Sequence, residues 1–174
     1  ELYKGHGVRK YGFHGTSHLY VSGKAIDLLD MPEEDTRIIT CHLGNGSSIS
    51  AVKGGKCIDT SMGLTPLGGV MMGTRPGDLD PYLPLFMTKA LGMSVDEVDK
   101  TLNKKSGLLG ICGHNDMRDI EERAEQGDAA CRLALDMFAN RVARFIGSYA
   151  MAMNGCDAIV FTAGIGENDG AMRK

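Results

Sequence analysis

The chain has 174 residues, of which 43% are hydrophobic and 24% are charged, and it contains no tryptophan. This length and apolar content suffice for one globular core and exclude a disordered or low-complexity chain. The formal net charge is −3, so no overall positive charge attracts nucleic acid or an anionic membrane, and neither is expected as a partner. Glycine, with 24 residues, is well above its average share, which indicates tight turns and close backbone approaches to a ligand.

The cysteines and the chain ends indicate where the protein works. The five cysteines are widely spaced and no two form a C-x-x-C pair, so neither a zinc ribbon nor a disulfide framework is supported. The sequence has no apolar run of membrane-spanning length and no secretion signal at its first residues. We therefore expect a reduced, soluble, cytoplasmic protein. The chain starts without Met and stops shortly after a loop signal, so we also expect it to be part of a longer protein.

The first half predicts a helix followed by a meander of three strands. Residues 17–29 have apolar side chains at helical spacing, and Pro32 follows their end. Short strand-like runs at 37–43, 49–52 and 56–61 are separated by Gly-rich turns and predict an antiparallel arrangement. Residues 63–81 are rich in Gly and Pro, and a loop of this length inside a domain is usually functional.

The second half predicts helices and one further strand. Helices are expected at 82–91, 94–102, 116–125 and 128–153, with a Gly-rich bend at 106–113. Ser94 and Glu97 have the spacing of a capping box at a helix start. Residues 158–162 have the composition of a buried strand and run into a Gly-rich loop. Together these elements predict a single α/β domain over residues 1–174.

Two glycine-rich turns are candidates for binding a nucleotide. In the first, Gly44-Asn45-Gly46 permits positive φ angles, so that backbone N–H groups can converge on an anion. The alternative is an ordinary hairpin turn, since Asn-Gly is common there. The second, Gly164-Ile165-Gly166, follows the last strand, where α/β proteins bind ligands. Neither turn matches a dinucleotide fingerprint or a P-loop.

Three other groups are candidates for chemistry. Arg75 lies in the Gly- and Pro-rich loop, and a guanidinium can neutralise a transferring phosphoryl group, although most loop arginines are only solvated. His14 and His18 are four residues apart, but Gly15 stands where a zinc protease needs Glu. His14 is therefore a candidate donor to a phosphoryl oxygen, with structural roles for both histidines as the alternative. Asp116 is either a ligand contact or an ordinary helix cap.

Six stretches of the sequence resemble the acetate kinase family and occur in the same order. They are Arg9–His18, Cys41–Ser48, Met62–Leu67, Met71–Arg75, Asn115–Asp119 and Phe161–Asn168. The resemblance covers the whole chain, but only the second, nucleotide-binding part of the family's two-lobed actin/hexokinase/Hsp70-like chain. It implies one lobe of this RNase H-like α/β fold, with a three-stranded antiparallel meander, a further strand and flanking helices. The first lobe and the extreme C-terminus would lie outside this chain.

The resemblance implies reversible phosphoryl transfer from ATP to acetate by a homodimer. Mg²⁺ would take part, with its ligands outside this chain and no metal ligand within it. His14 and Arg75 would stabilise the transferring group, and Phe13 and Pro66 would line the pocket for the acetate methyl group. The residues implied in ATP binding are His42, Leu43, Gly44, Asn45, Gly46, Asp116, Met117, Arg118, Gly164, Ile165, Gly166, Glu167 and Asn168.

The sequence leaves other functions open. A propionate or butyrate kinase of the same family would need only a roomier acid pocket. A non-catalytic nucleotide-binding domain has the same fold, although the joint presence of His14, Asn45, Arg75 and Asp116 argues against it. A metal hydrolase using His14 and His18 is a third alternative. Gly68 and Pro76 depart from the family pattern, outside the assigned site. Because one lobe is missing, we expect the isolated chain not to turn over at a useful rate.

Overall fold

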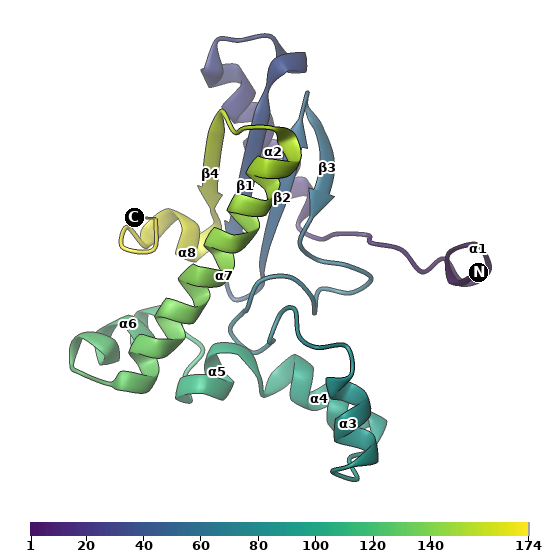
Figure 1. Cartoon of the computed structure of the whole chain (residues 1–174). Coiled ribbons are helices and arrows are strands. Elements are labelled where there is room, and N and C mark those ends of the chain that lie inside the picture. The colour runs from purple at the N-terminus through teal and green to yellow at the C-terminus, as the bar shows by residue number, and fades with distance from the viewer. Residues whose placement is uncertain (174) are drawn as a thin grey trace.

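A mixed four-stranded sheet forms the centre of the computed structural model, in the order β3-β2-β1-β4 (Figure 1). The structure describes residues 1–173, so Lys174, the last residue of the expected domain, lies outside the described residues. β1 (Arg37–Leu43), β2 (Ser47–Lys53) and β3 (Lys56–Thr60) form the antiparallel meander that the sequence predicts. β4 (Ala158–Thr162) pairs in parallel with β1. The α/β fold class is confirmed.

Helices cover both faces of this sheet. α2 (Gly15–Leu29) packs on one face, and α7 (Ala129–Met153) runs across the other (Figure 1). The shorter helices are α1 (Leu2–His6), η1 (Glu33–Asp35), α3 (Leu83–Lys89), α4 (Val95–Lys104), α5 (Gly107–Cys112), α6 (Met117–Glu125) and α8 (Ala163–Asn168). Within residues 1–173, none of the helices is long and apolar enough for a membrane crossing.

The side chains of β1 alternate between two different environments, as successive strand residues point to opposite faces. Those on the α7 side are fully buried in the main apolar core: Ile39, Cys41 and Leu43. On the α2 side, Ile38 packs with Ala25, whereas Thr40 hydrogen-bonds His18. His42 follows on this same side, near the end of the strand. The α2 face of the sheet therefore changes from apolar at the start of β1 to polar at its end.

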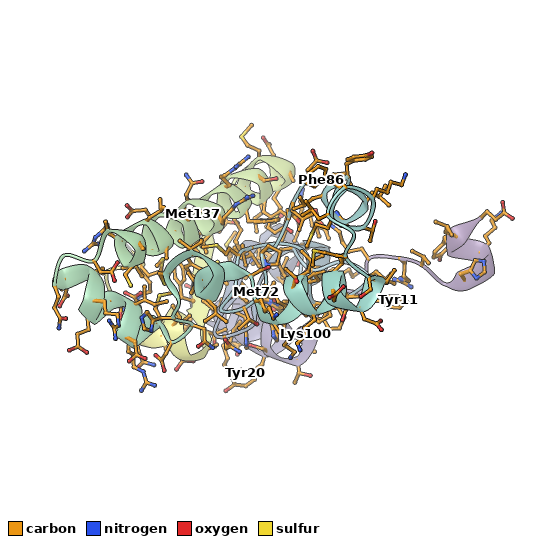
Figure 2. All side chains as sticks on the ribbon, turned by 90° about the horizontal axis from the view of Figure 1, so that it is seen from below. Tyr11, Tyr20, Met72, Phe86, Lys100 and Met137 are labelled. Atoms are coloured by element: carbon orange, nitrogen blue, oxygen red, sulfur yellow. The ribbon has the colours of Figure 1, made fainter. Side chains whose placement is uncertain are left out.

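The long segment 63–81 has no regular secondary structure but is held firmly. Val70 and Met72 are fully buried, and Met72 lies near the middle of the molecule seen from below (Figure 2). The N–H groups of Leu108 and Leu109 donate to the carbonyl oxygens of Met72 and Gly73 at 3.0 and 2.9 Å. These bonds fix the turn that carries Arg75 against the first turn of α5.

Three segments differ from the sequence prediction. α1 forms near the N-terminus, where the sequence predicted no helix, α5 replaces the expected bend at 106–113, and α8 replaces the expected loop after β4. Glycine disfavours helices, so these short glycine-containing helices give no helical signal, and tertiary contacts such as those of α5 decide the outcome. Within the described chain β4 pairs only with β1 and lies at the sheet edge, with Ile159 45% exposed, so the prediction of a buried strand was wrong.

Candidate functional site

A cavity of about 750 Å³ lies between the β1–β2 hairpin, the start of α6, and α8. This volume is typical of a site for a small organic ligand. Its lining residues are Gly44, Asn45, Gly73, Leu108, Asn115, Asp116, Met117, Arg118, Glu121, Gly164, Ile165, Asn168 and Asp169. The cavity therefore brings together the three distant sequence segments that were expected to bind ATP.

Not every residue expected at the nucleotide lines this cavity. The expected residues outside its lining are His42, Leu43, Gly46, Gly166 and Glu167. Leu43 is fully buried in the core, and Gly166 is buried against β1 and β4. Glu167 accepts hydrogen bonds from the Thr162 hydroxyl and the Ala163 N–H, both at 3.1 Å. In this structure Glu167 therefore fixes the start of α8.

The Gly44-Asn45-Gly46 segment is the connection of an antiparallel hairpin, as the simpler interpretation proposed. None of its residues has a positive φ angle, so the expectation of converging N–H groups in left-handed conformations was wrong. The segment is instead held by its neighbour, because the Gly73 N–H donates to the Asn45 carbonyl oxygen at 3.3 Å. A side chain on Gly73 would overlap the Asn45 amide. Asn45 is thus packed in place at the cavity wall.

Asp116 is both a helix cap and a cavity residue. Its carboxylate accepts from the Arg118 N–H at 3.0 Å and pairs with the Arg118 guanidinium at 2.7 and 3.0 Å. These contacts lower the pKa of Asp116. The capping interpretation is confirmed, and it also explains why the two side chains stand together at the cavity.

Three histidines gather where α2 begins. His14 precedes the helix with a left-handed φ of 59°, and its ring stacks on His42 with centroids 4.0 Å apart. The Ser17 hydroxyl lies 2.9 Å from Nδ1 of His42. Burial, and then the charges of His42 and Arg75, lower the pKa of His14 to about 4. The imidazole of His14 is therefore neutral near pH 7.

His14 and Arg75 converge beside Gly46, next to the cavity hairpin. A methyl group on Gly46 would lie 3.6 Å from His14 Nε2 and 3.8 Å from Arg75 Nη1. The Arg75 guanidinium is held by the Pro66 carbonyl oxygen, which accepts from Nη1 at 2.9 Å. A guanidinium fork with an imidazole at its side suits an anionic group.

The two residues expected at the acetate methyl group have different surroundings in the structure. Phe13 lines a second cavity of about 230 Å³, together with Tyr11, His18 and other residues of α2, β2 and β3. Pro66 does not line that cavity, and its carbonyl oxygen contacts Arg75 instead. Their shared acetate pocket stays a prediction.

The described residues do not fit a metal site. Within residues 1–173 no three His, Cys, Asp or Glu side chains are grouped to hold a metal ion. Asp116 is paired with Arg118, while burial and the adjacent Asp169 raise the pKa of Glu121 to about 7. Both ring nitrogens of His18 lie 2.7 Å from hydroxyl groups, so His18 is not directed at a metal with His14.

Several cavity residues were not identified from the sequence: Gly73, Leu108, Asn115, Glu121 and Asp169. Asn115 adjoins an expected contact, and Glu121 follows Met117 by four residues on α6, the spacing of one helix face. That spacing was a usable signal for Glu121. Leu108 had none, because its place depends on α5 packing against segment 63–81.

The fold and the cavity together define an α/β domain with one candidate ligand site. The β1–β2 hairpin, the start of α6 and the glycine-containing helix α8 meet at this site. The family model described as the acetokinase family matches residues 1–174. The chain belongs to this family.

Individual relatives agree with the family match. The acetate kinase of Shouchella clausii (strain KSM-K16) is 59% identical over 175 residues, which cover 100% of this chain and 44% of the relative. The crystal structure of Porphyromonas gingivalis acetate kinase matches with a TM-score of 0.95 and 47% identity, over 99% of this chain and 43% of that one. The crystal structure of a propionate kinase from Francisella tularensis subsp. tularensis SCHU S4 matches with a TM-score of 0.95 and 53% identity, over 100% of this chain and 45% of that one. The chain thus spans less than half the length of these relatives.

Proposed function

We propose that this chain is the nucleotide-binding lobe of an enzyme that reversibly transfers a phosphoryl group from ATP to acetate. The observation that carries the proposal is the convergence of His14 Nε2 and Arg75 Nη1 beside Gly46, at the edge of the 750 Å³ cavity. Phosphoryl transfer depends mainly on positioning and on neutralising charge, and these groups supply both.

In this proposal different parts of the site contact different parts of the substrates. The cavity holds the nucleoside between Asp116, Met117, Arg118 and the residues Gly164 to Asn168. Asn45, with its neighbours His42 to Gly46, faces the phosphates. His14 and Arg75 then contact the oxygens of the group in transfer, where negative charge develops. Phe13 and Pro66 would complete the acetate pocket with residues outside this chain.

We further propose that the isolated chain does not turn over. Its supporting observation is that relatives of known structure are more than twice as long. The other lobe would supply the rest of the acceptor site, and residues outside this chain would hold Mg²⁺. The complete enzyme would be a cytoplasmic homodimer.

The proposal is tested on the complete enzyme with ATP and acetate, by measuring acetyl phosphate formation. We expect Arg75→Ala and His14→Gln each to lower kcat about 100-fold or more, by analogy with other groups that stabilise transition-state charge. Arg144→Ala, on the exposed side of α7, is the control. Unchanged kcat in both site variants, or a complete enzyme that forms no acetyl phosphate, would overturn the proposal.

A second candidate is a propionate kinase, favoured by the match to the propionate kinase structure at 53% identity. One extra methylene changes binding in an apolar pocket by only about 1–3 kcal/mol. The ratio of kcat/KM for acetate and propionate in the same assay decides between the two acids.

A further inference from the structure

Four side chains on the α2 face of the sheet form a continuous hydrogen-bonded chain that ends at His14. Thr40 Oγ1 lies 2.7 Å from His18 Nδ1, and His18 Nε2 lies 2.7 Å from Ser48 Oγ. Ser48 Oγ lies in turn 2.8 Å from His14 Nδ1. Thr40 and Ser48 are fully buried, and His18 is 5% exposed. Water has little access to these contacts, so the groups must satisfy one another.

Only two proton arrangements satisfy this chain when both imidazoles are neutral. A neutral imidazole has one N–H donor and one acceptor nitrogen, and each hydroxyl has one proton to donate. Ser48 Oγ could also accept from both rings, but its own buried proton would then have no acceptor among the described residues. The three hydrogen bonds therefore point the same way, either from Thr40 toward His14 or from His14 toward Thr40. Burial lowers the pKa of His18 to about 4, as it does for His14, so both rings are neutral near pH 7.

The Thr40 hydroxyl, at the end of the hydrogen-bonded chain opposite His14, determines which of the two proton arrangements forms. Among the described residues its one hydrogen-bond partner is His18 Nδ1. If His18 donated to Thr40, the buried Thr40 proton would have no acceptor, which costs about 1–3 kcal/mol. Thr40 therefore donates to His18, His18 donates to Ser48, and Ser48 donates to His14 Nδ1.

We propose that Thr40 and Ser48 are positioning residues that hold neutral His14 in the tautomer whose proton is on Nε2. The consequence of this tautomer for catalysis rests on the function proposed above. In this tautomer His14 presents an N–H donor beside Arg75 Nη1, at the point near Gly46 where both nitrogens converge. The opposite tautomer would present a lone pair to a phosphoryl oxygen and repel it.

The tautomer is measured directly by ¹⁵N NMR of the complete enzyme labelled at histidine, without nucleotide. A His14→Gln spectrum identifies the His14 signals. The variants are Thr40→Val, which removes the donor hydroxyl, and Ser48→Ala, which breaks the chain next to His14. Ser50→Ala is the matched control, because Ser50 lies on the same face of β2 and bonds Thr60 at 3.0 Å instead of a histidine. Thr40→Ser keeps the hydroxyl and tests rescue.

We expect the wild type, Ser50→Ala and Thr40→Ser to carry the proton on Nε2 of His14, and Thr40→Val and Ser48→Ala to show a mixture of both tautomers. In the same enzymes kcat of Ser48→Ala falls in proportion to the fraction of His14 that has lost the Nε2 proton, about 2-fold for an even mixture, while KM for ATP stays unchanged. Thermal unfolding confirms that each variant is folded.

Two results would overturn the proposal. One is a wild-type His14 protonated on Nδ1, and the other is an unchanged tautomer in both folded variants. The failure of the proposed function gives a different result: the tautomers behave as expected, but His14→Gln leaves kcat unchanged. In that case the assignment of the proton holds, and only its catalytic use is refuted.

Discussion

The backbone of Gly107 lies directly against the carbonyl oxygen of Arg75, at a left-handed φ of +62°. An added side chain would overlap this oxygen and that of Met72, and would also be strained at this φ. We predict that Gly107→Ala lowers the free energy of unfolding by about 2 kcal/mol or more. The displaced turn would carry Arg75 away from His14, so kcat should fall as well.

The control for this variant is Gly147→Ala in the middle of α7, where nothing lies within 4 Å of the new methyl group. Alanine favours a helix over glycine by about 1 kcal/mol, so this variant should be slightly more stable. Urea unfolding of both variants measures the difference. Equal stability of the two would show that Gly107 is not under the constraint described.

Arg37 and Asp157 tie the starts of β1 and β4 together. The guanidinium pairs with the carboxylate at 2.7 and 3.0 Å, and the Arg37 N–H donates to the same carboxylate at 2.8 Å. The hydrogen bonds with Arg37 lower the pKa of Asp157, so its stabilisation is complete above the ordinary value of about 3.9 and is lost as pH falls through the lowered pKa.

We therefore predict that Asp157→Asn lowers the urea midpoint at pH 7 and that the difference from wild type shrinks in acid. Asp27→Asn is the control, since Asp27 forms an exposed pair with Lys24 at 3.3 Å, which contributes little. A wild-type minus Asp157→Asn difference that is constant from pH 7 to strong acid would contradict this.

Gly164 lines the cavity, and no atom from another part of the described chain lies within 4 Å of the position that a side-chain methyl group would take there. Gly164→Ala should therefore not lower the unfolding midpoint, and it should weaken MgATP binding about 10-fold, because the new methyl group takes space that the nucleotide needs. Calorimetric titration of the complete enzyme measures the binding. Gly23→Ala on α2, also without neighbours within 4 Å, is the control, and equal affinities in the two variants would remove Gly164 from the nucleotide site.

Glu121 makes stability and binding depend on pH near neutrality. Burial, and next its contact with Asp169, raise the pKa of Glu121 to about 7. A raised pKa of the folded state means that the full contribution is present below the ordinary pKa of about 4.3 and is lost as pH rises through 7. The ionised carboxylate would also repel nucleotide phosphates across the cavity.

We predict that Glu121→Gln flattens the fall in stability between pH 5 and 8, and that it reduces the loss of MgATP affinity over the same range. Glu122→Gln, which changes the exposed neighbouring residue, corrects for the titration of ATP itself. Identical pH profiles for the two variants would show that Glu121 titrates normally.

The sequence was a good guide to elements with strong local signals. The capping box of Ser94 and Glu97 forms as expected at the start of α4, and α7 begins and ends within one residue of its predicted limits, 128–153. These features depend on side chains close in sequence, which is why pattern alone suffices. α5 shows the opposite case, because its helix depends on carbonyl groups of segment 63–81 far along the chain.

The candidate site divides in the same way. Motifs named the segments at Asn45, Asp116 and Gly164, and the structure joins them at one cavity. Ser48 ends one of the matching stretches and Thr40 immediately precedes it, but the sequence did not show their hydrogen-bond partners, because these depend on the register that places both residues opposite α2. Phe13 and Pro66 could be tied to one another only by resemblance, and their common pocket stays a prediction, since the cavity that Phe13 lines does not include Pro66.

His14 and His18 also limit what acidification can do to this protein. With a pKa of about 4 for His14 and for His18, the free protein neither takes up nor releases protons at these rings across neutral pH. An enzyme built on this lobe would keep the same charge beside Arg75 while the acidity of its surroundings changes several-fold. Apart from the titration of ATP itself, a response of nucleotide binding to mild acid would then arise at Glu121, which lines the cavity.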